Sequence, residues 1–237
     1  MEPFRRSALV YDLIYEQRVD YDWHVANLRD LITGRLPDAK SLAEMAVGTG
    51  QILSRMRRWF EVVGCDISPN MLAVCRERHP ELDVRLGDYS TIDLGQSFDA
   101  VICVFSSIGY VRTVDRLHAA FENFARHLNE GGVIIVDGWL RPANAIDGFR
   151  SAETVDGNEA TLTRSVLARI RDNQTDMLAA HTLITADGIE YFEERHHMGL
   201  FDDATYVDAL QRAGFSGITV EDGFDGRGRF VGVLKSG

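Results

Sequence analysis

Short apolar runs alternate with amphipathic segments through the first half of the chain. The apolar runs are residues 41–47, 61–66, 82–86, 98–105 and 132–136. Between them, apolar positions recur at helical spacing over residues 51–59, 70–78 and 115–128. Strands that alternate with helices in this way predict right-handed crossovers and a parallel sheet with helices on both faces.

The two ends of the chain depart from this alternation. Residues 7–36 have the spacing of one amphipathic helix, which Gly34 and Pro37 would end. From about residue 152 to residue 200, apolar and polar positions alternate with period two, which predicts an insertion of antiparallel strands. Turn signals separate these strands at Asp156-Gly157, Asp172-Asn173 and Asp187-Gly188. A helix over residues 204–213 and strands over residues 218–221 and 229–234 are expected to follow.

These patterns predict an α/β fold with a doubly wound, mostly parallel sheet. The length of 237 residues fits a single domain with a modest insertion.

The formal net charge of -11 argues against a broad nucleic-acid-binding face or a polybasic membrane surface. No apolar run approaches the ~20 residues that span a bilayer, and the amino terminus lacks a secretory signal. Cys65, Cys75 and Cys103 lack metal-ligand spacing, so we expect buried thiols, no metal and a cytoplasmic location.

Candidate chemistry begins at the first turn between a strand and a helix, Glu44-Met-Ala-Val-Gly48-Thr-Gly50. Glycines allow the backbone to approach a ligand, and the next helix offers its amino-terminal N–H groups. A dinucleotide-binding motif has a third glycine at the position that Leu53 occupies here, so a nicotinamide cofactor is disfavoured. The next two strands end in Asp66 and in Gly87-Asp88-Tyr89. In a parallel sheet these ends face one crevice, where ligands bind.

The glycine turn followed by Asp66 and Asp88 resembles the signature of class I S-adenosylmethionine (SAM) dependent methyltransferases. The resemblance implies a seven-stranded Rossmann-like sheet and SAM as cofactor, with S-adenosylhomocysteine as product. The glycine turn would approach the methionine part of SAM, Asp66 the ribose and Asp88 the adenine amine. The implied cofactor-binding residues are Tyr15, Tyr21, Ala46, Gly48, Thr49, Gly50, Asp66, Ile67, Met71, Gly87, Asp88, Tyr89 and Phe105.

A narrower resemblance covers nearly the whole chain. Tyr11-Asp-Leu-Ile-Tyr15, Phe105-Ser-Ser-Ile-Gly-Tyr110 and Gly226-Arg-Gly-Arg-Phe-Val-Gly232 are similar to segments of the sugar N,N-dimethyltransferases of macrolide biosynthesis. That family implies N-methylation of a nucleotide-diphosphate (dTDP-type) deoxy amino sugar, as in desosamine and mycaminose. Where the family has Glu-Pro-Trp-Trp after the fifth strand, this chain has Asp137-Gly-Trp139-Leu, which leaves the sugar open.

The resemblance also divides the chain into regions. Residues 1–36 would form a helical lid over SAM, with Tyr15 and Tyr21 facing the cofactor. Residues 41–138 would form the SAM-binding core, residues 149–200 an antiparallel insertion over the active site, and residues 201–237 the last helix and closing strands.

The acceptor side is predicted at the same edge of the sheet. The fourth and fifth strands end at Phe105-Ser106-Ser107 and at Asp137-Gly138-Trp139, and the turn over residues 222–228 should lie beside them. Candidate substrate-binding residues are Ser106, Ser107, Trp139, Arg227 and Arg229, and candidate catalytic residues are His181, Tyr15 and Tyr110. The two arginines suit an anionic diphosphate, although such a turn can also be a solvated hairpin.

The histidines allow two interpretations. His181 lies on an alternating strand and either faces the pocket, where it would act as a base, or faces away from it. His196 and His197 lack a third ligand at metal spacing, so we expect strand positions between core and solvent.

Rival functions remain open at this point. They are an O-methyltransferase on another small metabolite, a SAM-binding protein without catalysis and, less favoured, a nicotinamide oxidoreductase. The expected partner is a small molecule, with no nucleic acid and no membrane, and a homodimer is left open.

Overall fold

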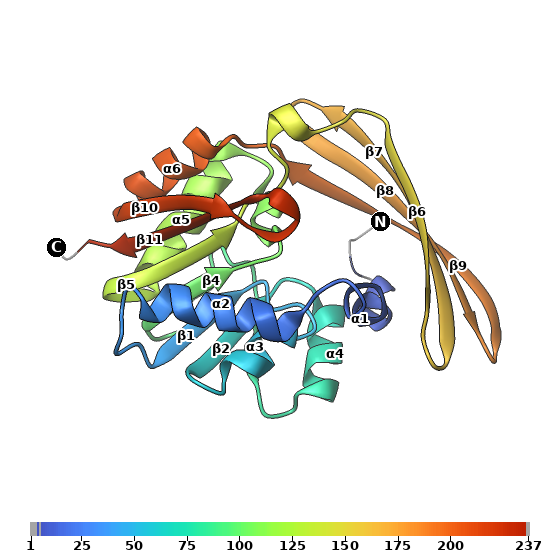
Figure 1. Ribbon diagram of the computed structural model, residues 1–237, viewed down its shortest axis with the longest axis horizontal. Coiled ribbons are helices and arrows are strands. Elements are labelled where there is room, and N and C mark those ends of the chain that lie inside the picture. The colour runs from blue at the N-terminus through green and yellow to red at the C-terminus, as the bar shows by residue number, and fades with distance from the viewer. Residues whose placement is uncertain (1–3, 5, 236–237) are drawn as a thin grey trace.

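A computed structural model describes residues 4 and 6–235 and contains two sheets (Figure 1). The larger sheet has seven strands in the order β10-β11-β5-β4-β1-β2-β3. Its strands are β1 (Ser41–Met45), β2 (Glu61–Asp66), β3 (Asp83–Leu86), β4 (Phe98–Cys103), β5 (Leu128–Asp137), β10 (Phe215–Asp222) and β11 (Gly228–Leu234). Strands β1 to β5 pair in parallel, while β11 is antiparallel to both β5 and β10. The predicted α/β fold class is confirmed.

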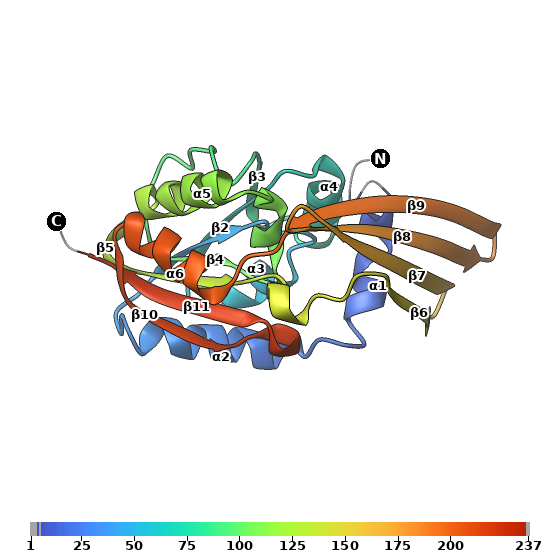
Figure 2. The same cartoon turned by 90° about the horizontal axis from the view of Figure 1, so that it is seen from above.

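Helices cover both faces of this sheet, as expected for a parallel sheet. They are α2 (Tyr21–Thr33), α3 (Gln51–Met56), α4 (Pro69–Arg78), α5 (Val114–Arg126) and α6 (Asp203–Arg212). Apolar side chains of α2, α3 and α4 share one core cluster, and those of α5 and α6 share another. Figure 2 shows α2 and α5 on opposite sides of the strands. In the described part of the chain, no helix is long and apolar enough to cross a membrane.

The direction of strand addition reverses between β1 and β4. From β1 the chain proceeds outward through β2 to β3, and then returns to place β4 on the other side of β1. A crevice forms at the carboxyl ends of strands where the order reverses in this way. The predicted glycine turn and acids therefore lie beside this crevice.

The prediction of one long amino-terminal helix over residues 7–36 is wrong, because the segment is divided. The structure divides it into η1 (Ser7–Leu9), α1 (Tyr11–Tyr15) and α2. Asp20 caps the start of α2 by accepting a hydrogen bond from the Trp23 amide at 2.9 Å. Such a cap begins a new helix, so the polar residues before it form a connection between two helices.

The second sheet consists of four antiparallel strands in the order β6-β7-β8-β9, and the three predicted turns join them. Its strands are β6 (Phe149–Asp156), β7 (Ala160–Arg171), β8 (Gln174–Thr185) and β9 (Gly188–Gly199). In Figure 1 it stands beside the larger sheet, and α1 lies between the two. Val10 and Ile14 pack against Leu162 of β7, which joins the amino-terminal segment to this sheet.

Candidate active site

A cavity of about 610 Å³ lies at the carboxyl edge of β1, β2 and β3. Most of the predicted cofactor-binding residues line it: Tyr15, Tyr21, Ala46, Gly48, Thr49, Asp66, Ile67, Met71, Asp88, Tyr89 and Phe105. Gly50 and Gly87 do not. A Cβ at Gly50 would lie 2.7 Å from Cys75 Sγ, and one at Gly87 would lie 2.6 Å from Ile92 Cδ1. These two glycines therefore allow close packing behind the cavity wall. We call this space the cofactor cavity.

Asp66 organises the glycine turn. Its two carboxylate oxygens accept hydrogen bonds from the Gly48 amide at 2.9 Å and from the Ser68 amide at 2.8 Å. Burial raises the pKa of this carboxyl, and the amide hydrogen bonds oppose that rise. Gly48 has a φ of 56°, and apart from Gly48 and its two chain neighbours no described atom lies within 4 Å of the position a Cβ would take there. The turn thus leaves open space in front of the backbone.

Glu44 contributes a buried acid to the floor of the cofactor cavity. Among the described residues, its Oε2 atom has no hydrogen-bond partner. Burial raises the pKa of this carboxyl, and nearby Asp66 raises it further. A buried acceptor without a partner is costly, and the ammonium group of a ligand would satisfy it. SAM carries such a group, so the acceptor that Glu44 provides in this cavity fits SAM.

Asp88 is held by Ser90 and Arg116. The Ser90 hydroxyl and amide donate to one oxygen at 2.7 and 2.8 Å, and Arg116 donates to the other at 2.7 Å. Burial alone would raise the pKa of Asp88, but these hydrogen bonds lower it overall. The carboxylate is therefore charged and oriented at the rim of the cavity.

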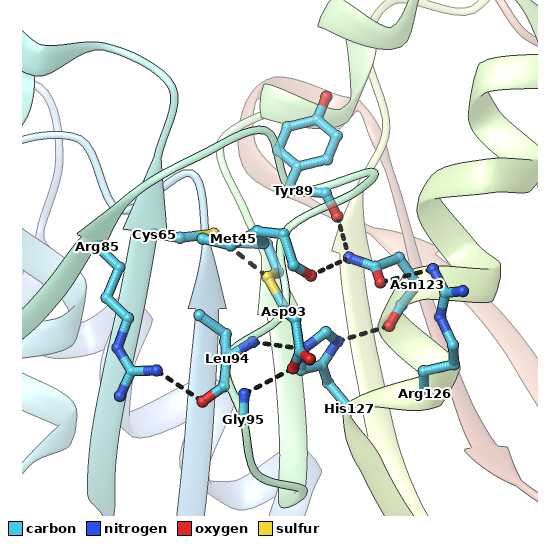
Figure 3. A network of polar contacts seen from close by, with 11 residues as sticks. Met45, Cys65, Arg85, Tyr89, Asp93, Leu94, Gly95, Asn123, Arg126 and His127 are labelled. Carbon is cyan, nitrogen blue, oxygen red and sulfur yellow. Dashed lines mark hydrogen bonds and ion pairs between the residues drawn. The ribbon is translucent and has the colours of Figure 1, made fainter.

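A polar network on α5 supports the segment that follows Asp88 (Figure 3). Asn123 donates its side-chain amide to the carbonyls of Tyr89 and Ile92 at 2.8 and 3.0 Å. His127 accepts from the Leu94 amide at 2.9 Å and contacts the Asn123 carbonyl through Nδ1. His127 is therefore a buried structural residue, and the network fixes Tyr89 against the cofactor cavity.

Asp12 is a site residue that the sequence reasoning missed. It is 2% exposed, although it lies on the short helix α1. Its oxygens accept hydrogen bonds from the Thr49 hydroxyl at 2.7 Å and from the Gln51 side-chain amide at 2.9 Å, and Arg78 forms an ion pair with it. Asp12 thereby ties the amino-terminal segment to the glycine turn. The available signal was an acid between the apolar residues of an amphipathic segment.

A second cavity of about 740 Å³ extends from the cofactor cavity toward the second sheet. The two cavities share six residues, most of them aromatic: Phe4, Tyr11, Tyr15, Phe105, Ser107 and Tyr110. We call these six residues the partition and the second space the acceptor cavity. The partition includes the predicted residues Tyr15, Ser107 and Tyr110, each of which lines both cavities.

Arg227 lies in the acceptor cavity with Trp139. Its guanidinium is 4.2 Å from the centre of the Trp139 ring and donates to the Ser106 hydroxyl at 3.1 Å. Burial lowers the pKa of Arg227, and its Nε atom has no partner among the described residues. Ser106 lines neither cavity. Its hydroxyl donates to the Gly138 carbonyl at 2.7 Å, so Ser106 supports Arg227 from behind.

Arg229 has a different position from the one predicted. It is 4% exposed and lines neither cavity. Its guanidinium binds both oxygens of Asp137, at 2.6 and 3.2 Å, and donates to Asn27 at 2.6 Å. Asp137 in turn accepts from the Phe105 amide at 3.0 Å. Because Arg229 is the register partner of Asp137 across β11 and β5, the pair is a structural ion pair.

His181 faces the acceptor cavity. Its ring stacks on Phe192 at 4.7 Å, and Nδ1 has no hydrogen-bond partner among the described residues. Burial and the nearby Arg164 charge lower the pKa of His181 to about 4. The imidazole is therefore neutral at neutral pH, but it is a weak base.

The prediction that His196 lies between core and solvent is wrong. It is 5% exposed, lines the acceptor cavity, and its Nδ1 lies 2.8 Å from the Tyr110 hydroxyl oxygen. Burial lowers the pKa of His196 to about 4. The period-two pattern left the direction of this side chain unassigned, because both faces of β9 border a cavity at this point. His196 lines the acceptor cavity, and its neighbours Arg195 and His197 line the cofactor cavity.

A doubly wound sheet with a glycine turn and two acids at its carboxyl edge defines the class I methyltransferase fold. A family model described as a methyltransferase domain matches residues 42–132. The chain is 36% identical over 230 residues to dTDP-3-amino-3,4,6-trideoxy-alpha-D-glucopyranose N,N-dimethyltransferase of Streptomyces venezuelae, covering 95% of this chain and 97% of the relative. The chain therefore belongs to the SAM-dependent nucleotide-sugar N,N-dimethyltransferases, as the resemblance implied.

Two solved structures are similar to the whole chain. The crystal structure of Streptomyces venezuelae DesVI has a TM-score of 0.92 and 36% identity, covering 97% of this chain and 98% of that one. SAM-bound CalS10, an amino pentose methyltransferase from Micromonospora echinaspora involved in calicheamicin biosynthesis, has a TM-score of 0.86 and 30% identity. That match covers 95% of this chain and 97% of CalS10.

Proposed function

We propose that this enzyme N,N-dimethylates the amino group of a dTDP-type deoxy amino sugar in natural-product biosynthesis. The observation that carries the proposal is the partition, which separates a cavity suited to SAM from an acceptor cavity that holds Arg227. The acceptor sugar would lie under the second sheet, with its amine at the partition and its diphosphate toward Arg227. Arginine suits this task because its planar donors match phosphate oxygens.

The residues of the chain mainly align the reactants. When bound, SAM would supply a methyl group on a positively charged sulfur. The amine nitrogen would bond to this carbon in line with the breaking C–S bond, so that S-adenosylhomocysteine leaves and the methylated amine then loses a proton to solvent. Glu44, Asp66 and Asp88 would hold the cofactor from the floor and rim of its cavity. Correct alignment alone can lower such a barrier by about 7–11 kcal/mol. The apolar surroundings of Phe105 and Trp139 disfavour a charged amine, so they favour the neutral nucleophile.

A turnover screen tests the proposal. Purified enzyme is incubated with SAM and a panel of dTDP-linked amino sugars, and the products are analysed by mass spectrometry. We expect one or two added methyl groups on at least one nucleotide-linked amino sugar, and very slow turnover of the same sugar without its nucleotide. Equal rates for both forms would contradict the acceptor class, although methyl transfer itself would stand.

The same screen addresses the alternatives. Hydroxylated analogues that lack the amine are added to the panel for this purpose. An O-methyltransferase would methylate these analogues, and a SAM-binding protein without catalysis would methylate nothing in the panel. The cytoplasmic location stays a prediction, and a homodimer stays open. Among the described residues, the three cysteines are buried and unbonded, which is compatible with a reducing compartment.

A further inference from the structure

One hydrogen bond joins the partition to the second sheet. Tyr110 of η2 (Ser107–Val111) borders both cavities, and its hydroxyl lies 2.8 Å from Nδ1 of His196 on β9. The ring of Phe4 covers this pair, at 5.1 Å from His196 and 5.9 Å from Tyr110. The pair is thus enclosed, and one of its members faces the place where the two cavities meet.

The surroundings of His196 select one tautomer of its ring. A neutral imidazole has one nitrogen that donates and one that accepts. Oε2 of Glu194 lies 3.9 Å from Nε2 of His196. Burial opposes ionisation of Glu194, but hydrogen bonds from Ser7 and from the amides of Phe4 and Arg6 lower the pKa of that carboxyl. The negative charge favours a proton on Nε2, so Nδ1 becomes the acceptor.

The tautomer decides what Tyr110 offers to the substrate. When Nδ1 accepts, the Tyr110 hydroxyl donates its proton to His196, and its oxygen is left as an acceptor toward the partition. An acceptor amine can then donate an N–H to this oxygen and keep its own lone pair free. In the opposite tautomer, His196 would donate to Tyr110, whose hydroxyl would then donate to the amine lone pair and block the nucleophile.

We propose that His196 is a positioning residue for methyl transfer. It accepts the Tyr110 hydroxyl proton and makes the Tyr110 oxygen an acceptor for an N–H group of the substrate amine, with the amine lone pair directed at the cofactor cavity. Glu194 selects the required tautomer. This role rests on the proposed function, because it needs an amine acceptor.

Two variants of nearly equal shape separate this role from packing. His196→Asn retains an acceptor near the position of Nδ1, whereas His196→Leu removes it. We expect His196→Leu to lower kcat by about tenfold, the rate equivalent of one neutral hydrogen bond, and His196→Asn to stay within about threefold of the unmodified enzyme. SAM affinity should not change in either variant. In a Tyr110→Phe background, His196→Leu should have little further effect. Equal losses in the two variants, or a full loss from His196→Leu in that background, would overturn the proposal.

Nitrogen NMR of the unmodified protein gives a readout that needs neither variant activity nor substrate. With ¹⁵N-labelled histidine, and with His196→Asn used to assign the signals, we expect His196 to be neutral at pH 7 and protonated on Nε2. A proton on Nδ1 would overturn the role of His196. If that result came from an enzyme that methylates amino sugars, the proposed function would stand. An enzyme that methylates none would instead contradict the proposed function and this role together.

Discussion

The cofactor cavity and the acceptor cavity are built in different ways. The acids and glycines of the cofactor cavity lie at the ends of three neighbouring strands, within residues 44–89. The acceptor cavity gathers side chains from α1, the segment after β5, the second sheet and the turn before β11. The acids and glycines of the cofactor cavity therefore follow from local strand–turn–helix units, whereas the acceptor cavity depends mainly on contacts between distant segments. Variants in each region should fail in different ways.

The largest expected effect is structural and tests whether Arg229 belongs to the acceptor cavity at all. Arg229→Ala leaves Asp137 as an unpaired buried charge, so we expect a loss of about 3–5 kcal/mol in the free energy of unfolding. Denaturant titration measures this loss. The control is Arg212→Ala, which breaks an exposed pair with Asp208 and should cost less than about 1 kcal/mol. Similar losses in the two variants would show that the Arg229 ion pair is not a buried structural contact.

The cofactor cavity should respond most strongly at Asp66. Asp66→Ala removes charge-assisted hydrogen bonds to the bound cofactor and to the glycine turn, and we expect SAM affinity to fall by about 1.5–3 kcal/mol, or roughly 10- to 100-fold. Calorimetry measures the affinity, and circular dichroism checks the fold. Asp38→Ala removes an exposed acid that precedes β1 and lines neither cavity, so it should leave the affinity unchanged. An unchanged affinity in folded Asp66→Ala would place the cofactor elsewhere.

Asp66 and Arg229 also show which residues sequence reasoning can place and which it cannot. Asp66 could be predicted because the end of a strand and the edge of a parallel sheet fix its place without knowledge of distant residues. Arg229 could not, because its partner Asp137 is 92 residues away and is opposed to it only by the register of β11 on β5. Arg227, two residues earlier, lies in the turn and lines the acceptor cavity, and its binding of substrate stays a prediction.

The acceptor histidines show the same limit. The alternating pattern predicts that β8 and β9 are strands, but the side of the strand that faces a cavity depends on how the second sheet lies over the partition. His181 was left with two orientations, and His196 was assigned to the wrong environment. The sequence did not indicate Asp12 for a related reason. Its partners Thr49 and Gln51 are distant along the chain, and only the fold brings them to it.

Arg227 tests the acceptor cavity directly. Arg227→Ala should raise the KM for a dTDP-linked amino sugar by about tenfold, because one charge-assisted contact to the diphosphate is lost. SAM affinity should stay the same, since Arg227 does not border the cofactor cavity. Steady-state kinetics with each substrate varied in turn measures both. A change in SAM affinity with an unaltered sugar KM would reverse the assignment of the two cavities.

His181 should contribute less to the rate than an active-site base would. A group whose pKa is about 4 accepts protons weakly, so His181→Asn should lower kcat by less than about tenfold. The matched control is His118→Asn, which changes a histidine on α5 outside both cavities. Single-turnover rates measured with saturating substrates give the comparison. A loss within the ~10²–10⁴ range of general-base catalysis would make His181 the catalytic base after all.

The smallest effect concerns how the acceptor cavity responds to acid. In the folded protein the pKa of His181 is about 4, because of burial and the Arg164 charge, with Glu194 opposing them. In an unfolded chain a histidine has a pKa near ~6.5. As pH falls from about 6.5 toward 4, the unfolded state binds this proton first, so the free energy of unfolding decreases. Between pH 7.5 and pH 5.8, the unmodified protein should therefore lose about 1 kcal/mol more stability than His181→Asn does. Denaturant titrations of both proteins at the two pH values measure the difference. If the two proteins lose stability equally over this range, His181 is protonated as easily in the folded protein as in the unfolded one. Water would then reach the His181 ring in the acceptor cavity, contrary to the burial of that ring.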